Sequence, residues 1–358
     1  MAQDYLKSNS ISLRRLRQSN FIRDLTQEVK ISHKQFLQPL FVVQDIAKRE
    51  SIPALTGVFR ETPDTLITQI ESDIEAGVQK FLLFGVPSKK TTNNFNFDFC
   101  AQQIQNIKKH FGKDVFLAVD VCLCSFTEHG HCGILSESDH IENDSTVSEL
   151  VRAACTYAEA GADCVAPSDM MDGRVRAIRS SLDARNYTRT LIMSYSAKFH
   201  SKFYGPFRIA ANSAPNTNTL TDHLTCDLTD HLTCDLTDHL TCDLTDRATY
   251  QIDPARPKDA FLSSLRDAEE GADILMVKPG LPYLDILSQL TKQIPRPWAV
   301  YEVSGEYAAI ELLAEKKLIA ANAAHLEAWI AFARAGASMI ISYGARNAKN
   351  WIYELLAI

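Results

Sequence analysis

The sequence predicts one α/β domain, a (β/α)₈ barrel of the TIM type, with an extended N-terminal arm before it. Two observations predict this fold class. Short, continuously apolar runs alternate with amphipathic stretches through the middle and end of the chain, as expected when helices cover a buried parallel sheet. There are eight such runs, the number of strands in a closed barrel, and 358 residues suit one barrel with extensions.

Each predicted strand is a short run of apolar and β-branched residues. The runs are QPLFV (38–42), KFLLFGV (80–86), VFLAVDVCL (115–123), CVAPSD (164–169), LIMSYS (191–196), ILMVKP (274–279), WAVYEVS (298–304) and MIISYG (339–344). They are too short and too continuously apolar for surface helices, so they predict buried parallel strands. An open doubly wound sheet is the alternative, but no run leads into the G-x-G-x-x-G turn that would favour it.

The stretches between the runs predict amphipathic helices. Segments such as TLITQIESDIEAGV and HLEAWIAFARAGA carry apolar residues three and four positions apart. Several end in Ala-Gly or Glu-Gly-Ala just before the next run, where glycine ends a helix in the left-handed conformation.

Two segments fall outside the alternating pattern. Residues 1–35 are polar and arginine-rich, and they predict an arm that is either solvated or packed on a neighbouring subunit; residues 36–358 form the barrel domain. Residues 220–246 hold three copies of LTDHLTCD followed by LTD. Identical copies eight residues apart drift around a helix and do not converge. We therefore interpret the repeat as a tolerated loop insertion rather than a metal array.

The composition is typical of a soluble globular protein, with 46% hydrophobic and 23% charged residues. A net charge of -7 argues against a general binder of nucleic acid or membrane surfaces, because both need a basic face. The N-terminus lacks the apolar core of a signal peptide, and no apolar run reaches the length of a membrane span, so a cytoplasmic location is expected. Nine cysteines then predict thiols or metal ligands rather than disulfides.

Reactive side chains end six of the eight predicted strands. The carboxyl ends of TIM-barrel strands meet at one mouth, which holds the active site. The residues concerned are Asp120, Cys122, Cys124, Ser168, Asp169, Ser194, Ser196, Lys198, Lys278, Ser304 and Tyr343. Their convergence at one mouth predicts an enzyme.

Lys278 follows the apolar run ILMV and is the predicted nucleophile. Burial and nearby positive charge favour a neutral amine, which can form a Schiff base. The alternative is a lysine paired with a barrel carboxylate such as Asp120. Lys198 follows the neighbouring strand, so its amine is expected close to that of Lys278; the alternative for Lys198 is a solvent-facing position in a loop.

The segment DVCLCSFTEHGHCG predicts a metal site. Cys122 and Cys124 share one side of a strand, and Cys132 of the following loop can complete a three-thiolate zinc site. Three protein ligands leave a fourth position for water or substrate, as in catalytic zinc sites. His129 and His131 are expected to support the site rather than bind the metal. The alternative is three unrelated buried thiols.

These residues resemble a known family, the porphobilinogen synthases or 5-aminolevulinate dehydratases. The matching stretches are QPLFVV, DVCLCSFTEHGHCG, GADCVAPSDMMDGRV, MSYSAKFHSKFYGPFR, EEGADILMVKPG and YEVSGEYA, in family order from about Leu13 to the end. The resemblance implies condensation of two 5-aminolevulinate molecules to porphobilinogen, with loss of two waters, in tetrapyrrole and haem biosynthesis. It also implies a homo-octamer whose arm embraces a neighbour.

The resemblance further implies roles for residues of this chain. Lys278 matches the lysine of the main Schiff base, Lys198 the second active-site lysine, and the three cysteines the ligands of the zinc-dependent branch. The substrate-binding residues that it implies are Ser304 and Tyr343 for one carboxylate, Arg208 for the other, Asp120 and Ser168 lining the site, and Tyr204 and Phe207 in its wall and lid.

The chain departs from the family pattern in three places. The repeat lies between Arg208 and Arg247, where the family has a shorter lid loop, so its effect on lid closure stays open. Arg247 is the only basic residue before the lid's Tyr-Gln, where the family often has two, so its substrate contact is also open. Ser263 stands where many members carry a glutamate for an allosteric magnesium, which argues against that Mg²⁺ site.

The sequence is also compatible with two rival functions. A Schiff-base barrel of the aldolase type would need Lys278 but no metal. A non-catalytic barrel that binds metals or senses redox state would need the thiols but not Lys278.

Overall fold

The computed structural model describes residues 13–53, 55–213 and 247–357, without the side chains of 355–357. The repeat at 220–246 and the first part of the predicted arm therefore lie outside the described residues.

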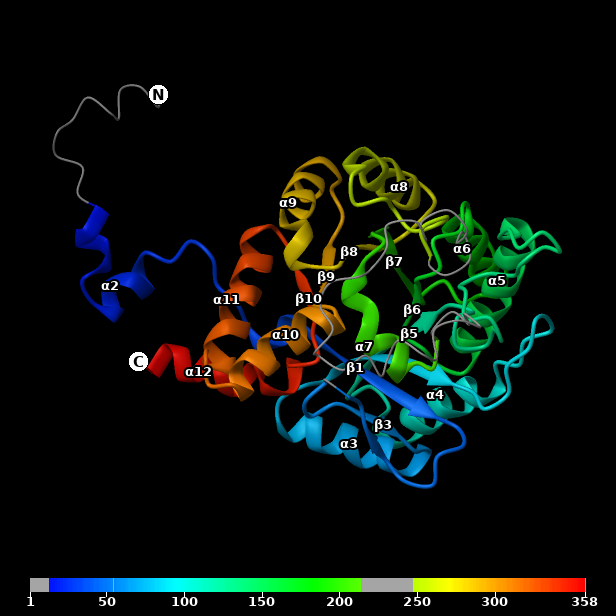
Figure 1. Ribbon diagram of the computed structural model, residues 1–358, viewed down its shortest axis with the longest axis horizontal. Coiled ribbons are helices and arrows are strands. Elements are labelled where there is room, and N and C mark those ends of the chain that lie inside the picture. Colours follow the sequence, from blue (N-terminus) through cyan, green and yellow to red (C-terminus); the bar gives the residue numbers. More distant parts are fainter. Residues whose placement is uncertain (1–12, 54, 214–246, 358) are drawn as a thin grey trace, which may run out of the picture.

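Eight parallel strands form a closed barrel in the described part of the chain (Figure 1). They are β1 (Phe36–Val43), β4 (Lys80–Val86), β5 (Phe116–Val121), β6 (Cys164–Pro167), β7 (Leu191–Lys198), β8 (Ile274–Lys278), β9 (Trp298–Tyr301) and β10 (Met339–Ile341). Each pairs with the next, and β10 pairs back with β1, which closes the ring. A short hairpin of β2 (Glu50–Ser51) and β3 (Phe59–Glu61) extends the sheet beside β1. The predicted (β/α)₈ barrel is confirmed.

Helices surround this barrel (Figure 1). They are α3 (Pro63–Glu75), α4 (Asp98–Phe111), α5 (Asn143–Glu159), α6 (Arg174–Ala184), α7 (Gly205–Ala210), α8 (Pro257–Glu269), α9 (Leu284–Gln293), α10 (Ser304–Glu315), α11 (Ala321–Arg334) and α12 (Ala348–Ala357). Among the helices that the structure describes, none combines the length and the apolar character needed to cross a membrane.

Glycine ends four of these helices, as the sequence predicts. Gly77, Gly161, Gly271 and Gly336 follow α3, α5, α8 and α11 with φ angles of 98°, 106°, 105° and 107°. This left-handed conformation closes a helix without the Cβ clash that other residues would suffer. Each turn leads the chain directly into the next barrel strand.

Side chains along the strands alternate between two apolar layers. An inner layer includes Leu37, Phe41, Leu82, Ala118, Ala166, Met193, Tyr195, Met276, Ala299 and Tyr301. An outer layer packs the strands against the helices through residues such as Leu40, Leu83, Val119, Val165, Leu275 and Val300. Because both faces of the strands are buried, the strand sequences are continuously apolar. Polar groups are then concentrated at the strand ends.

The described part of the arm lies apart from the barrel. Figure 1 shows α2 (Asn20–Leu25) projecting away from it, and neither α2 nor the 3₁₀ turn Leu13–Arg17 contains a buried residue. Phe21 and Leu25 expose 82% and 85% of their surface. The arm therefore presents apolar side chains that its own barrel does not cover.

Candidate active site at the barrel mouth

Two lysines lie side by side at the carboxyl ends of neighbouring strands. Lys198 is the last residue of β7 and Lys278 the last residue of β8, and the parallel register pairs them directly. Both are buried, with 5% and 4% of their surface exposed. Lys198 Nζ donates a hydrogen bond to the carbonyl oxygen of Ser168, just beyond β6. Lys198 is thus part of the strand and buried, not in a solvent-facing loop.

A bulge in β7 places Lys198 on the same side of the sheet as Lys278. Ser194 Oγ donates to Asp267 of α8 at 2.6 Å, and Ser196 Oγ accepts from Ser264 of α8 at 3.0 Å, so both serines face the helix layer. In a regular strand, Lys198 would face the same side as Ser196. The register with β8 shifts after Ser194, which reverses this alternation. The expectation that Ser194 and Ser196 line the mouth is wrong for that reason.

Asp169 also faces away from the mouth. Its side chain forms an ion pair with the fully buried Arg174, whose Nη2 also contacts Asp267 at 3.1 Å. Asp169 Oδ1 accepts from the amide of Met171 at 2.7 Å. This network holds the chain just after β6, where the carbonyl of Ser168 contacts Lys198. Asp169 therefore holds the backbone next to Ser168 and does not line the mouth of the barrel.

Aromatic rings surround the amine of Lys278. The distances from Nζ to the ring centroids are 4.2 Å for Tyr301, 5.0 Å for Phe207, 5.1 Å for Tyr195 and 5.3 Å for Tyr204. Burial, and then the positive charge of Lys198, lower the pKa of Lys278 to about 7. The charge of Asp120 opposes this shift and is outweighed. A lysine held as an ammonium by a paired carboxylate would have the opposite shift, so the paired alternative is not supported.

Asp120 completes the charged set around the lysines. Burial raises the pKa of its carboxyl group to about 6, against the lowering effect of Lys198 and Lys278. Its Oδ1 has no hydrogen-bond partner among the described residues. The carboxyl group therefore retains an acceptor for a ligand.

A small enclosed cavity joins these groups. It is lined by Phe84, Asp120, Cys124, Ser168, Lys198, Tyr204, Phe207, Arg247 and Lys278. Its free volume is about 10 Å³, roughly the space of one water molecule. Entry of a substrate therefore requires movement of a wall, to which Tyr204 and Phe207 contribute from the start of α7.

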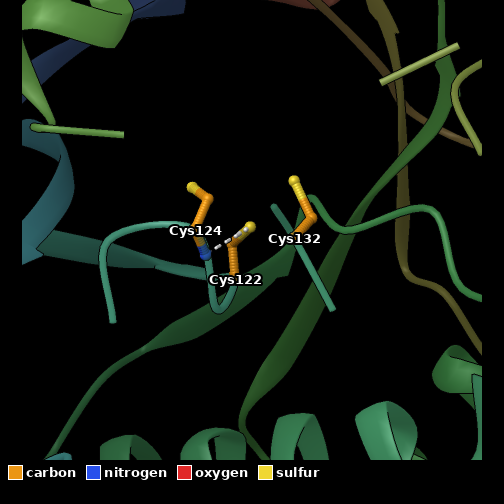
Figure 2. Close-up of side chains that lie close together, drawn as sticks. All are labelled: Cys122, Cys124 and Cys132. Carbon is orange, nitrogen blue, oxygen red and sulfur yellow. Dashed lines mark hydrogen bonds between the residues drawn. The ribbon is translucent and has the colours of Figure 1, made fainter. Parts of the chain in front are cut away.

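Three cysteines converge beside this cavity. Figure 2 shows Cys122 and Cys124 just beyond β5 and Cys132 on the loop that follows. Their sulfur atoms lie within 4.8 Å of one another, and all three residues are buried. Hydrogen bonds from the other two thiols lower the pKa of Cys132 well below its usual value. The three unrelated thiols of the alternative reading would not converge in this way.

The donor set fits a soft, tetrahedral metal ion. Thiolates are preferred ligands of Zn²⁺, and the three cysteines leave a fourth position. Among the described residues, this is the one group of three or more His, Cys, Asp or Glu side chains placed to bind a metal. His129 accepts from the amide of His131 at 3.1 Å, and His131 Nδ1 lies 3.3 Å from the hydroxyl of Tyr250. Both histidines stand beside the cluster and outside it.

Ser304 and Tyr343 lie behind the wall of the cavity. Ser304 Oγ accepts from the amide of Phe207 at 3.0 Å and donates to the carbonyl of Phe203 at 3.2 Å, which ties α7 to the start of α10. The hydroxyl of Tyr343 accepts from that of Tyr301 at 3.3 Å. Arg208 lies on α7 and is half-buried. None of the three residues Ser304, Tyr343 and Arg208 is among the lining residues of the cavity.

Two features of the site are missing from the sequence predictions. Tyr195 and Tyr301 contact Lys278, yet each sits inside an apolar run where an aromatic residue predicts only core packing. Glu306 accepts from the amides of Val303 at 2.7 Å and Gly280 at 3.1 Å, and so links the loop after Lys278 to the start of α10. Glu306 has one sequence signal, its position two residues after Ser304, because a glutamate in the first turn typically caps a helix. This signal predicts the contact with Val303 but not the one with Gly280.

Ser263 lies in a different hollow, on α8. This hollow of about 530 Å³ also includes Asp172 and Arg266. The guanidinium of Arg266 pairs with Asp172 and, at 3.3 Å, with Asp267, and Nη2 donates to Ser263 Oγ at 3.4 Å. A cation of the protein thus already neutralises the carboxylates next to Ser263.

Comparison with known proteins identifies the family. The family model described as delta-aminolevulinic acid dehydratase matches residues 10–351. The delta-aminolevulinic acid dehydratase of Helicobacter pylori is 40% identical over 343 residues, which cover 94% of this chain and 97% of the relative. That of Bacillus subtilis is 36% identical over 345 residues, covering 95% and 98%.

A solved structure gives the same result. Delta-aminolevulinic acid dehydratase (porphobilinogen synthase) from Toxoplasma gondii, in complex with the reaction product porphobilinogen, superimposes with a TM-score of 0.85 and 37% identity, covering 96% of this chain and 92% of that one. Fold, sequence and the match over nearly the whole length agree. The chain belongs to the delta-aminolevulinic acid dehydratase family.

Proposed function

We propose that this chain is a porphobilinogen synthase that condenses two molecules of 5-aminolevulinate to porphobilinogen with loss of two waters, a step of tetrapyrrole and haem biosynthesis. The observation that carries the proposal is the pair of buried lysines, Lys198 and Lys278, in register at the ends of β7 and β8. Family membership supplies the substrate class.

Lys278 is the proposed nucleophile. Its pKa of about 7 leaves a large neutral fraction at neutral pH, and only the neutral amine adds to a ketone. Nζ adds to the ketone carbon of one substrate, and loss of one water leaves a carbon–nitrogen double bond to Nζ. Lys198, the proposed second active-site lysine, contributes a neighbouring positive charge that favours the neutral form of Lys278. The surrounding aromatic rings exclude water that would hydrolyse the imine.

Zinc is the proposed metal, held by Cys122, Cys124 and Cys132. Bound there, it would polarise the carbonyl of the second substrate or activate a water. Its ligands adjoin the lysines, because Cys124 lines the same cavity as Lys198 and Lys278. No magnesium site is proposed at Ser263.

Residues around the lysines are proposed to bind the substrates. Asp120, Ser168, Tyr204 and Phe207 line the cavity, and Arg247 lines it with a buried guanidinium. Ser304 and Tyr343 are proposed for one carboxylate and Arg208 for the other. Because Ser304 currently bonds to the amide of Phe207, we propose that movement of α7 frees its hydroxyl group when the substrate enters.

Assembly, location and domain limits are also proposals. The uncovered Phe21 and Leu25 of the arm support an arm, residues 1–35, that embraces a neighbour in a homo-octamer. We propose a cytoplasmic location, and a barrel domain over residues 36–358 that carries the repeat at 220–246 in its active-site lid.

The two rival functions have less support. An aldolase-type barrel gives no reason for three converging buried thiols beside the lysines. A non-catalytic barrel that only binds metals gives no reason for a buried amine with a lowered pKa.

Turnover tests the proposal directly. The zinc-loaded protein, supplied with 5-aminolevulinate alone, is expected to release one porphobilinogen for every two molecules consumed, measured by mass spectrometry of the product. Failure of the folded, zinc-loaded protein to form any porphobilinogen would contradict the proposed function.

A further inference from the structure

The three thiols of the cluster have unequal structural support. Cys122 and Cys124 follow directly on β5, whose pairing with β4 and β6 fixes their backbone. Cys132 lies eight residues further along, on a loop outside the strands and helices. Its distance from the other two sulfur atoms therefore depends on whatever holds that loop.

The loop is held by a turn more than a hundred residues later in the chain. The hydroxyl of Tyr250 accepts a hydrogen bond from the amide of Cys132 at 3.2 Å and lies 3.3 Å from His131 Nδ1. The ring of Tyr250 packs against the three cysteines. One side chain thus contacts the backbone of the third ligand and the apolar side of the cluster.

Arg247, at the start of the turn that carries Tyr250, holds the same loop. Its Nη2 donates to the carbonyl of Gly130 at 2.9 Å and to that of Ser213 at 2.7 Å, and only 2% of the residue is exposed. A buried guanidinium requires such partners, because desolvation of the charge is costly. Arg247 also lines the cavity of the two lysines. It therefore connects the loop that carries Cys132 to the end of the α7 segment and to the active site.

We propose that Tyr250 and Arg247 are positioning residues for the third thiolate, and that the turn 247–250 sets the metal affinity of the cluster by holding loop 130–132. This inference rests on the zinc site of the proposed function. The physical reason is preorganisation: two ligands are fixed by the barrel, and the third is fixed by hydrogen bonds to its backbone. Partners outside the ligand set typically change metal affinity by about 10- to 100-fold when they are removed.

Tyr250→Phe is the sharpest variant. It keeps the ring against the thiols and removes the hydroxyl, and with it the acceptor for the Cys132 amide and the contact with His131 Nδ1, both of which hold loop 130–132. Tyr307→Phe is the matched control, because it removes a tyrosine hydroxyl that donates to a backbone carbonyl, that of Thr56 at 2.9 Å, away from the thiols. Arg247→Lys is the second test, since the lysine side chain is one bond shorter and does not place its nitrogen where Nη2 bridges the two carbonyls.

The measurement is zinc affinity of the full-length protein, by competition with a chromophoric chelator, with cobalt(II) absorption to count thiolate ligands at saturation. We expect about 10-fold weaker zinc binding for Tyr250→Phe, weaker binding for Arg247→Lys, and an unchanged affinity for Tyr307→Phe. The thiolate-to-cobalt absorption at saturation should stay the same, because all three ligands remain.

The possible outcomes separate the two proposals. Wild-type protein that binds no zinc would overturn the zinc site and this inference with it. Wild-type protein that binds zinc, together with a Tyr250→Phe variant of equal affinity, would overturn the inference alone. If Tyr250→Phe does not fold, unchanged affinity in Arg247→Lys overturns it.

Discussion

The lysine pair and the thiol cluster are neighbours built in different ways. Lys198 and Lys278 are both strand residues, and the register of β7 with β8 places them together. The thiol cluster draws two ligands from the end of β5 and a third from a loop that Tyr250 and Arg247 hold. The register of β7 with β8, including the bulge in β7, is therefore enough to form the lysine pair, whereas the cluster also needs contacts outside the strands. The two halves of the site should respond differently to perturbation.

The largest effect is expected for Lys278→Met. The variant removes the nucleophile but keeps a side chain of similar length in an apolar, aromatic pocket, so turnover should fall by more than about 1,000-fold while the melting temperature does not fall. Initial rates and thermal unfolding check both parts. The exposed Lys316→Met serves as the control. A variant that keeps substantial turnover would contradict the role of Lys278.

Removal of the metal should distinguish the thiol cluster from the lysine pair, because only the cluster is expected to bind zinc. A chelator is expected to lower porphobilinogen formation by at least about 100-fold, because metal polarisation contributes several kcal/mol to the chemical step, and added zinc should restore it. The same chelator saturated with zinc is the control. Full activity of protein shown by elemental analysis to be metal-free would rule out a catalytic zinc.

The pH dependence of Schiff-base formation should report the environment of Lys278. Below its pKa of about 7 the amine is protonated and cannot add to a ketone. The rate of borohydride trapping with 5-aminolevulinate should thus rise about 10-fold per pH unit up to pH 7 and level off above it. A rate that keeps rising to pH 10 would indicate a lysine with an ordinary pKa, and hence a solvated amine.

The smallest effect is expected for removal of the repeat. Deleting residues 220–243 takes out three copies of eight residues, and a shorter loop changes closure entropy only slightly. The melting temperature should stay within about 3 °C of the wild-type value. A much larger fall would show that the repeat is not a tolerated insertion.

The sequence predicts the barrel and the two reactive groups for local reasons. Continuous apolar runs mark strands buried on both faces, and Cys-x-Cys at a strand end places Cys122 and Cys124 together without further information. Lys278 is recognisable because a lysine that ends an apolar run is buried.

The remaining features depend on contacts that no local pattern reveals. The bulge in β7 reverses the faces of Ser194 and Ser196 relative to Lys198, and simple alternation therefore misplaces the two serines. Tyr250 reaches Cys132 across 118 positions of sequence, so its role is visible only after folding. Glu306 acts on the amide of Gly280 across 26 positions, with the same consequence.

The most direct test is to incubate the metal-free and zinc-loaded proteins with 5-aminolevulinate, reduce them with borohydride, and map the adduct by peptide mass spectrometry. Because the lysine pair forms from strand register alone, both proteins should carry the reduced adduct on Lys278, and only the zinc-loaded protein should release porphobilinogen without borohydride. If the zinc-loaded protein carries no reduced adduct on Lys278, the Schiff-base role of this lysine is contradicted.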